Sequence, residues 1–285
     1  MALPGNSLPH HIGNAAANGD KDTVFAWLDA GGAINDKDDQ GYTLLTCVAN
    51  GTMEHQEHNA ASLSLCQDLI ARGADVNLGN ANNGTTPLHF ASMPNPTVHA
   101  VDIDGSFAFA RQMRRVLLDA GADINVKGNN NQTPLICAVG FIEWDESRRH
   151  RHRVALVSEL LRAGASLDIR INMSEAFSMA GLSGRFDSVE DLLRAMESNI
   201  DGLRDNEHWA MIRSLVEGVR AAGGTWAAYA RLPRRRVLRL RSLMARGRAR
   251  TADPIIEPVF RLPNEMCWHV LKFWRATCPT TGGVL

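Results

Sequence analysis

The sequence lacks the short motifs that mark the common enzyme classes. It contains no GxxxxGK[ST] phosphate-binding loop, no GxSxG nucleophile turn, no HExxH zinc motif and no GxGxxG dinucleotide motif. No stretch approaches the roughly 20 apolar residues that a membrane span requires. The first five residues also lack the basic and apolar pattern of a secretory signal peptide. We therefore expect no catalytic activity, no cofactor and no membrane span.

Cysteine is scarce, and its positions form neither a disulfide nor a metal-binding pattern. The five cysteines are odd in number and include no CxxC pair or zinc-ligand spacing. Cys47, Cys66 and Cys137 fall in segments with helical character, where a buried free thiol is the ordinary interpretation. These features favour a reducing compartment, the cytoplasm or the nucleus.

One short sequence pattern occurs four times in the first 170 residues. A helix-like Leu/Ile-x-Ala/Arg-Gly ending is followed within two residues by Ala and then by a polar turn; its glycine is Gly31, Gly73, Gly121 or Gly164, with spacings of 42, 48 and 43 residues. Glycine ends a helix readily because it adopts the left-handed conformation at little cost. A helix end that recurs at such intervals is typical of a stacked repeat protein, in which each unit packs on its neighbours.

The opposite end of the unit carries a second recurring signature. It appears as Gly84-Thr-Thr-Pro-Leu-His-Phe-Ala91, as Asn131-Gln-Thr-Pro-Leu-Ile-Cys-Ala138 and, without proline, as Gly41-Tyr-Thr-Leu-Leu45. Proline is well placed in the first turn of a helix, where its missing N–H costs nothing, and the preceding threonine can cap that turn.

At this point the chain resembles the ankyrin repeat family over residues 8–197. The resemblance implies an all-α solenoid of about five helix-loop-helix units with β-turn fingers, followed by a C-terminal helical cap. The implied organisation is a repeat domain over residues 1–198 and a basic C-terminal helical segment over 199–285. The units run approximately over 8–39, 40–81, 82–128, 129–170 and 171–198. Inserts between the two helices of a unit are expected at 52–62, 92–110 and 141–153.

The resemblance also implies where a partner protein binds. In ankyrin proteins the contacts come from variable positions beside the finger turn and at the end of the first helix, and the chain is expected to act as a non-catalytic protein–protein interaction scaffold. Tyr42, Met93 and Phe141 are the expected anchors because aromatic and flexible apolar groups dominate interface energies; alternatively, Met93 and Phe141 pack under their own inserts. The full set is Asp39, Gln40, Tyr42, Asn50, Asn82, Asn83, Thr85, Met93, Asn129, Asn130, Gln132 and Phe141.

Two asparagines in the fingers carry a further expectation. Asn77 and Asn125 follow the Gly-Ala-Asp-Val/Ile of their fingers and resemble the asparagines that a hydroxylase modifies in many ankyrin repeats. We therefore expect them as hydroxylation positions.

The C-terminal part of the chain differs sharply in charge. Residues 1–230 contain 18 Lys+Arg and 28 Asp+Glu, a balance of −10, whereas 231–285 contain 12 and 3, a balance of +9. The spacing of apolar residues predicts helices over 205–222, with Asp205 as its N-cap, and over 264–274, with an arginine-rich segment at 226–250 between them. This segment could attach the chain permanently to a larger assembly, and that is the alternative function.

The last predicted helix and the residues before it resemble two docking elements. Leu240-Arg-Ser-Leu243 with Leu262-Pro263 is similar to part of a SOCS box, and Leu262-Pro263-Asn-Glu265 is similar to the F-box-like motif of PRANC proteins. Both families recruit ubiquitin-ligase scaffolds, so the resemblance implies a substrate adaptor. The competing interpretation is a cap over the last repeat. The implied docking residues are Leu262, Pro263, Met266, Val270, Phe273 and Trp274.

Two polar clusters fall in the expected inserts. His55 and His58 would share one face of a helix, but a zinc site needs three or four converging ligands, so no metal is expected. The basic block Arg148–Arg153 and the arginines after residue 230 would suit phosphates. Because the whole chain has a pI of only about 6.8, nucleic acid is not an expected partner.

Overall fold

The computed structural model describes residues 7–51, 59–93, 103–129, 131–140, 150–173, 182, 184–247, 262, 263 and 266. The chain divides into two compact units, Met1–Trp226 and Ala227–Leu285. This division lies beyond the predicted boundary at residue 198, because two further helices belong to the first unit. Among the described residues, no helix has the length and apolar character that a membrane crossing demands.

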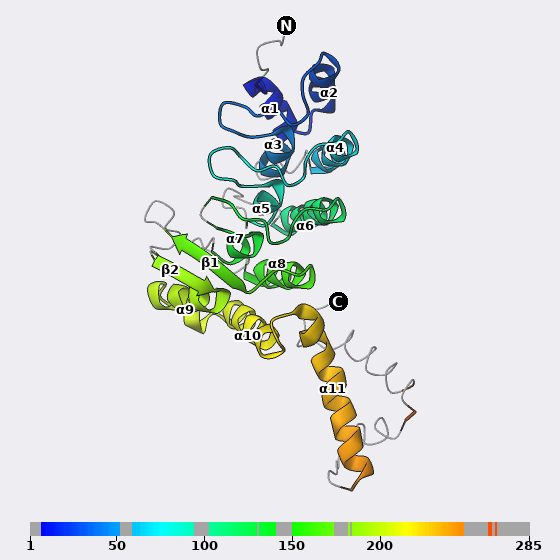
Figure 1. Cartoon of the computed structure of the whole chain (residues 1–285), viewed down its shortest axis with the longest axis vertical. Coiled ribbons are helices and arrows are strands. Elements are labelled where there is room, and N and C mark those ends of the chain that lie inside the picture. Colours follow the sequence, from blue (N-terminus) through cyan, green and yellow to red (C-terminus); the bar gives the residue numbers. More distant parts are fainter. Residues whose placement is uncertain are drawn as a thin grey trace. The chain divides into compact units, whose positions relative to one another are not determined.

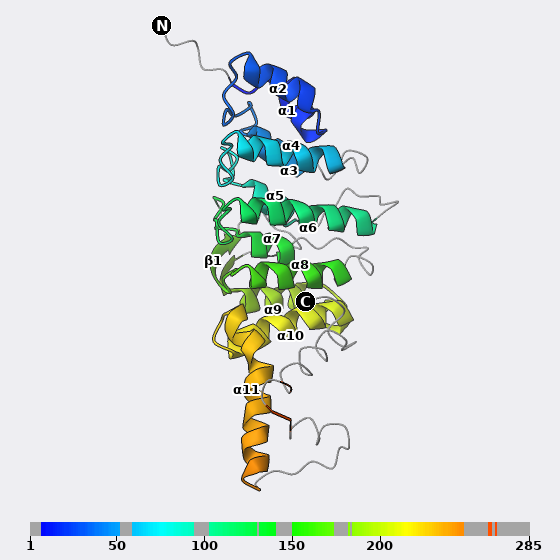
Figure 2. The same ribbon diagram turned by 90° about the vertical axis from the view of Figure 1, so that its right-hand side faces the viewer.

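The first unit is a stack of antiparallel helix pairs, which confirms the all-α repeat solenoid. The first helices form one layer, the second helices form a parallel layer, and the finger turns project from the side of the first helices (Figure 1). Figure 2 shows the same pairs edge-on, each packed above the next. The pairs are α1 (His10–Ala17) with α2 (Lys21–Asp29), α3 (Leu44–Gly51) with α4 (Asn59–Ala71), α5 (Pro87–Ala91) with α6 (Ile103–Asp119), and α7 (Pro134–Gly140) with α8 (His150–Arg162).

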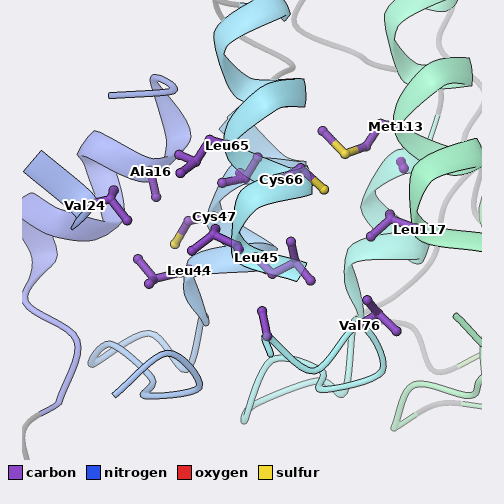
Figure 3. Close-up of a cluster of buried hydrophobic side chains, with 14 of the residues drawn as sticks. Ala16, Val24, Leu44, Leu45, Cys47, Leu65, Cys66, Val76, Met113 and Leu117 are labelled. Atoms are coloured by element: carbon purple, nitrogen blue, oxygen red, sulfur yellow. The ribbon is translucent and has the colours of Figure 1, made fainter. Parts of the chain in front are cut away.

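Apolar residues at equivalent places in successive second helices form much of the core. Leu65 and Leu69 of α4 correspond to Met113 and Leu117 of α6, and all four are fully buried in one cluster (Figure 3). Each such side chain contributes roughly 1.5–3 kcal/mol when removed from water. Cys66 lies in the same cluster, and burial raises the pKa of its thiol to about 12, so it stays protonated at neutral pH.

The turn before each first helix has a fixed backbone conformation. Gly41 and Gly84 have φ values of 82° and 67°, and Asn131, at the matching position of the next unit, has 58°. A Cβ on Gly41 would also lie 2.8 Å from Ala81 of the following finger. Glycine tolerates this region freely and asparagine better than most residues, which explains the residue types at this position.

The second helices begin earlier than predicted. Helices α4, α6 and α8 start at Asn59, Ile103 and His150, inside the segments expected to be inserts. Phe109, within the segment 92–110, is buried on α6. A helix anchored by its apolar face propagates into polar sequence, since each added residue gains a backbone hydrogen bond. Ser92 and Met93, also within 92–110, follow α5, and the remaining insert residues lie outside the described part of the chain.

The fifth unit departs from the predicted pattern of two helices. Strand β1 (Asp168–Met173) pairs antiparallel with β2 (Gly184–Ser188), and helix α9 (Val189–Asn199) follows. Side chains alternate along β1: Ile169 and Ile171 are buried, whereas Asp168 and Arg170 are exposed. This period of two favours a strand. The residues between 173 and 182, where a first helix was expected, lie outside the described residues.

Helix α10 (Glu207–Ala221) closes the stack. It follows a short 3-10 turn, η4 (Leu203–Asp205), and packs against α8 and α9. Its buried residues are Trp209, Ile212, Val216 and Val219, the apolar face that the sequence indicated. Asn206, not the expected Asp205, is its N-cap, because the Asn206 side chain accepts the backbone N–H of Trp209 at 3.0 Å. Helix α11 (Trp226–Ala245) follows at the boundary with the second unit.

Candidate functional site: the finger surface

A row of asparagine side chains joins the bases of consecutive fingers. The Oδ1 atoms of Asn35, Asn77 and Asn125 accept backbone N–H groups of the next finger, from Asp75, Asp123 and Ser166, at 2.9, 2.8 and 2.8 Å. Asn77 and Asn125 also donate their side-chain N–H to the carbonyls of Gly121 and Gly164 at 3.2 and 3.3 Å. The two expected hydroxylation positions, Asn77 and Asn125, therefore make hydrogen bonds between fingers. Their hydroxylation stays a prediction.

A second set of hydrogen bonds joins the finger tips. Asn80 and Asn82 each donate a side-chain N–H to the carbonyl of Gln40 at 2.9 Å. Asn129 donates to the carbonyl of Asn82 at 2.6 Å, and its own backbone N–H donates to Asn83 at 2.8 Å. Three consecutive tips are thus tied to one another by side-chain amides. We call the two sets of bonds together the finger ladder.

Buried polar groups connect the ladder to the helices. The Nε2–H of His89 donates to the carbonyl of Gln132 at 3.0 Å, while its Nδ1 accepts the backbone N–H of Thr86 at 3.1 Å. Burial lowers the pKa of His89, so the ring is neutral and both nitrogens serve as structural partners. The imidazole is a helix-capping group, consistent with its place in the repeat signature.

Several predicted contact residues are used within the fold. Thr85 and Gln132 are buried, and the Gln132 side chain donates to the Thr85 hydroxyl at 3.3 Å. Asn83 is half-buried and accepts the Thr85 N–H at 3.0 Å with its side chain. These three side chains shape the fingers from inside and offer little surface to a partner.

Other predicted contact residues are accessible on the fingers. Asp39, Gln40, Asn82 and Asn129 are exposed, and Tyr42 is half-buried beside them. The Tyr42 ring lies 5.9 Å from the ring of buried Phe90, centroid to centroid, in a tilted arrangement that fixes its orientation. These five residues are named the finger face.

The remaining predicted contacts are spread along the helix ends. Asn50 is exposed near the end of α3, and Met93 is half-buried just after α5. Asn130 and Phe141 lie outside the described residues, as do His55, His58, Val270, Phe273 and Trp274. Of the docking residues, Leu262 is half-buried, Pro263 is exposed and Met266 is 56% exposed. The described residues contain no group of three or more side chains that could hold a metal ion.

Two buried arginines that the sequence reasoning missed support the first helices. Arg114 on α6 donates to the carbonyl of Ala91 at 2.8 Å, and Arg153 on α8 donates to the carbonyl of Val139 at 3.0 Å. Arg114 also pairs with Glu159 at 2.9 Å, which offsets the cost of burying its charge. The carbonyls at a helix end need such partners. Each arginine lies three residues before a buried leucine of its helix, Leu117 or Leu156, and this spacing was the available signal.

Comparison with known proteins relates the chain to proteins that carry ankyrin repeats. It is 31% identical over 97 residues to an ankyrin repeat protein of fowlpox virus, covering 34% of this chain and 44% of the relative. It is 36% identical over 124 residues to an ankyrin repeat-containing protein of Treponema pallidum, covering 43% and 34%. The E3 ubiquitin-protein ligase KEG of Arabidopsis thaliana is 28% identical over 159 residues, covering 55% and 8%. The chain thus spans less than half the length of each of these relatives. No family model matches it.

Proposed function

Because the chain is an ankyrin repeat protein, we propose that it is a non-catalytic scaffold that binds a partner protein on its finger face. The observation that carries the proposal is the finger ladder, which holds three consecutive tips in register through side-chain amides. A surface that is ordered before binding loses little conformational entropy when the partner arrives. Backbone groups of the fingers are satisfied within the ladder, which leaves the side chains of Asp39, Gln40 and Tyr42 for recognition.

The finger face has the composition of a small interface centre. Tyr42 supplies an aromatic ring held by Phe90, and such rings are common energetic anchors. Asp39, Gln40, Asn82 and Asn129 surround it with exposed hydrogen-bonding groups. We infer a partner with a complementary polar surface and a cavity for the Tyr42 ring.

The sharper form of the proposal is a ubiquitin-ligase substrate adaptor. Pro263 and Met266, in the segment that resembles a docking element, are exposed. Helix α10 already covers α8 and α9, so the end of the repeat stack has a cover that does not involve these residues. Both observations favour docking over capping for the residues after 261. The resemblance to KEG adds no argument here, because it covers only 8% of that ligase.

We also place this activity in a reducing compartment, the cytoplasm or the nucleus. Cys47, Cys66 and Cys137 are free and buried in the repeats. Free cysteines persist where thiols are kept reduced.

The experiment is affinity purification with the full chain and two matched variants, read by quantitative mass spectrometry. Tyr42→Ala with Asn82→Ala removes the centre of the finger face, and Arg115→Ala with Asp119→Ala alters an exposed pair on α6. The partner should be lost from the first variant and kept by the second. A partner recovered equally by both would contradict binding on the finger face.

The adaptor form has its own variant in the same experiment. Pro263→Ala with Met266→Ala should lose a ubiquitin-ligase scaffold while keeping the finger-face partner. If wild type recovers no ligase scaffold, the adaptor form fails and the scaffold proposal stands. A purified chain that aggregates alone but is stable within a complex would favour the permanent-subunit alternative, since such subunits expose apolar contact surface.

A further inference from the structure

The charge of the chain divides along the same line as its compact units. Ala227–Leu285 carry 12 Lys+Arg and 3 Asp+Glu, whereas Met1–Trp226 carry 18 and 28. The pI of about 6.8 therefore averages over two units whose net charges have opposite signs. Binding to a polyanion depends on the local density of positive charge. The net charge of the second unit, and not that of the whole chain, therefore determines whether a polyanion can bind there.

Helix α11 carries arginines at regular intervals along one side. Arg231, Arg235 and Arg239 recur every four residues, so they follow one side of the helix at intervals of about 6 Å. Arg231 and Arg239 are exposed, whereas Met244, which the helical period places on the opposite side, is half-buried. These three positions form a slightly inclined row along one side of a helix of 20 residues, with Arg231, Arg235 and Arg239 as its members.

Nothing near this row in the sequence neutralises it. Residues 226–250 include nine arginines and contain no aspartate, glutamate or lysine. Within the described ranges, no carboxylate pairs with the guanidinium groups of Arg231, Arg239 or Arg246. Arginine matches phosphate with two parallel N–H donors, which a lysine cannot do. An arginine-only row therefore fits an array of phosphates better than a general acidic surface.

The contact on the other side of the helix distinguishes two sources of phosphate. The Nη2 of Arg241 donates to the carbonyl of Leu262 at 2.6 Å, and Leu243 and Met244 are half-buried, so part of the apolar surface of α11 is already covered. A helix that lies in a membrane surface needs its apolar side open to acyl chains. The exposed arginines therefore remain as the binding surface, and this favours nucleic acid over lipid.

We propose that α11 binds the phosphate backbone of nucleic acid, without reading its sequence, through the row of Arg231, Arg235 and Arg239. This surface lies in the second compact unit and is separate from the finger face, so it adds a second kind of ligand to the scaffold. Phosphate contacts hold a protein on a duplex but carry no sequence information. Affinity should therefore depend on salt and not on base composition.

The test measures binding of the full chain to a fluorescent DNA duplex of mixed sequence by anisotropy between 50 and 200 mM salt. Arg231→Gln, Arg235→Gln and Arg239→Gln are combined in one variant. The matched control carries Arg115→Gln, Arg185→Gln and Arg194→Gln, three exposed arginines of the first unit with the same loss of charge. The slope of log affinity against log salt should fall by about 0.9 for each α11 arginine that contacts a phosphate. The control should change the slope far less.

Two further measurements complete the test, one with lysine variants and one with lipid vesicles. The same three α11 positions changed to lysine should keep the salt slope, because the number of neutralised phosphates is unchanged. Vesicles with and without phosphatidylserine test the lipid source. Absence of duplex binding at 50 mM salt, equal losses in the glutamine variant and the control, or binding to anionic vesicles without binding to the duplex would each overturn the proposal.

Discussion

The side chain of Asn77 and the backbone of Asp123 join two fingers that are 46 residues apart in sequence. Asn77 Oδ1 accepts the Asp123 N–H at 2.8 Å, and the same amide donates to the carbonyl of Gly121 at 3.2 Å. One side chain thus satisfies a donor and an acceptor of the neighbouring repeat. The stack is therefore held on two sides, by leucines between the helices and by amides between the fingers.

Replacement of Asn77 should weaken this connection without changing the core. Asn77→Ala loses both bonds, and we expect a loss of about 1–2 kcal/mol in the free energy of unfolding. Asn50→Ala, at an exposed site on α3, is the matched control and should be nearly neutral. Chemical denaturation followed by circular dichroism measures both. Equal midpoints for the two variants would show that the amide row contributes no stability.

Gly121 offers a test of backbone conformation alone. Its φ is 91°, and a Cβ there would meet no atom within 4 Å, so a larger residue has room but is strained. Gly121→Val should cost about 1–3 kcal/mol, and Gly121→Asn less, because asparagine tolerates positive φ better. Thermal melting of the two variants should rank them in that order. A valine variant that melts with the wild type would contradict the assigned repeat register.

Much of this architecture could be predicted because each repeat contains residues that are typical of helix starts and helix ends. Gly73 and Gly121 mark the ends of second helices, and Thr86-Pro87 marks the start of a first helix, since the backbone needs of these positions are local. The β1–β2 pair was not predicted because the alternation around Ile169 and Ile171 lies at the junction of the expected fourth and fifth units, where the resemblance implied helical repeats.

The site was predicted in part, for the same physical reason. Exposure of Asp39 and Gln40 follows from the turn that carries them, which is local. Thr85 and Gln132 are buried because they hydrogen-bond to each other across neighbouring fingers. The sequence of a single repeat does not show such a contact. The arginine contacts of Arg114 and Arg153 with helix ends likewise required the packed pair.

The neutral, buried His89 should make stability depend on pH. Its folded pKa lies below the ordinary value of 6.5, chiefly because burial disfavours the charged ring. The unfolded chain therefore binds a proton first as pH falls, so His89 contributes stability that is present above about pH 6.5 and is lost as pH decreases toward the folded pKa. Unfolding measured at pH 7.5, 6.5 and 5.5 should show this decline. His89→Gln should show a shallower decline, and an unchanged one would exclude His89 as its source.

Helix α10 should be essential to the first unit. Trp209 is fully buried, and its Nε1–H donates to Glu197 at 3.0 Å. Trp209→Ala should cost about 3–5 kcal/mol, as for other buried aromatic residues. Met211→Ala, on the exposed side of the same helix, should cost little. If denaturation gives the two variants similar stability, α10 is not the cover of the repeat stack.

Binding of a partner protein at the finger face is the central claim, and site-directed photo-crosslinking tests it most directly. A benzophenone-bearing phenylalanine is placed at Tyr42 in one variant and at Arg115, on the exposed surface of α6, in another. Each full-length variant is expressed in its native host and irradiated, and the adducts are identified by mass spectrometry. The account predicts that the Tyr42 variant forms a specific adduct with one partner protein and that the Arg115 variant does not. An adduct from Arg115 alone, or none from Tyr42, would contradict it.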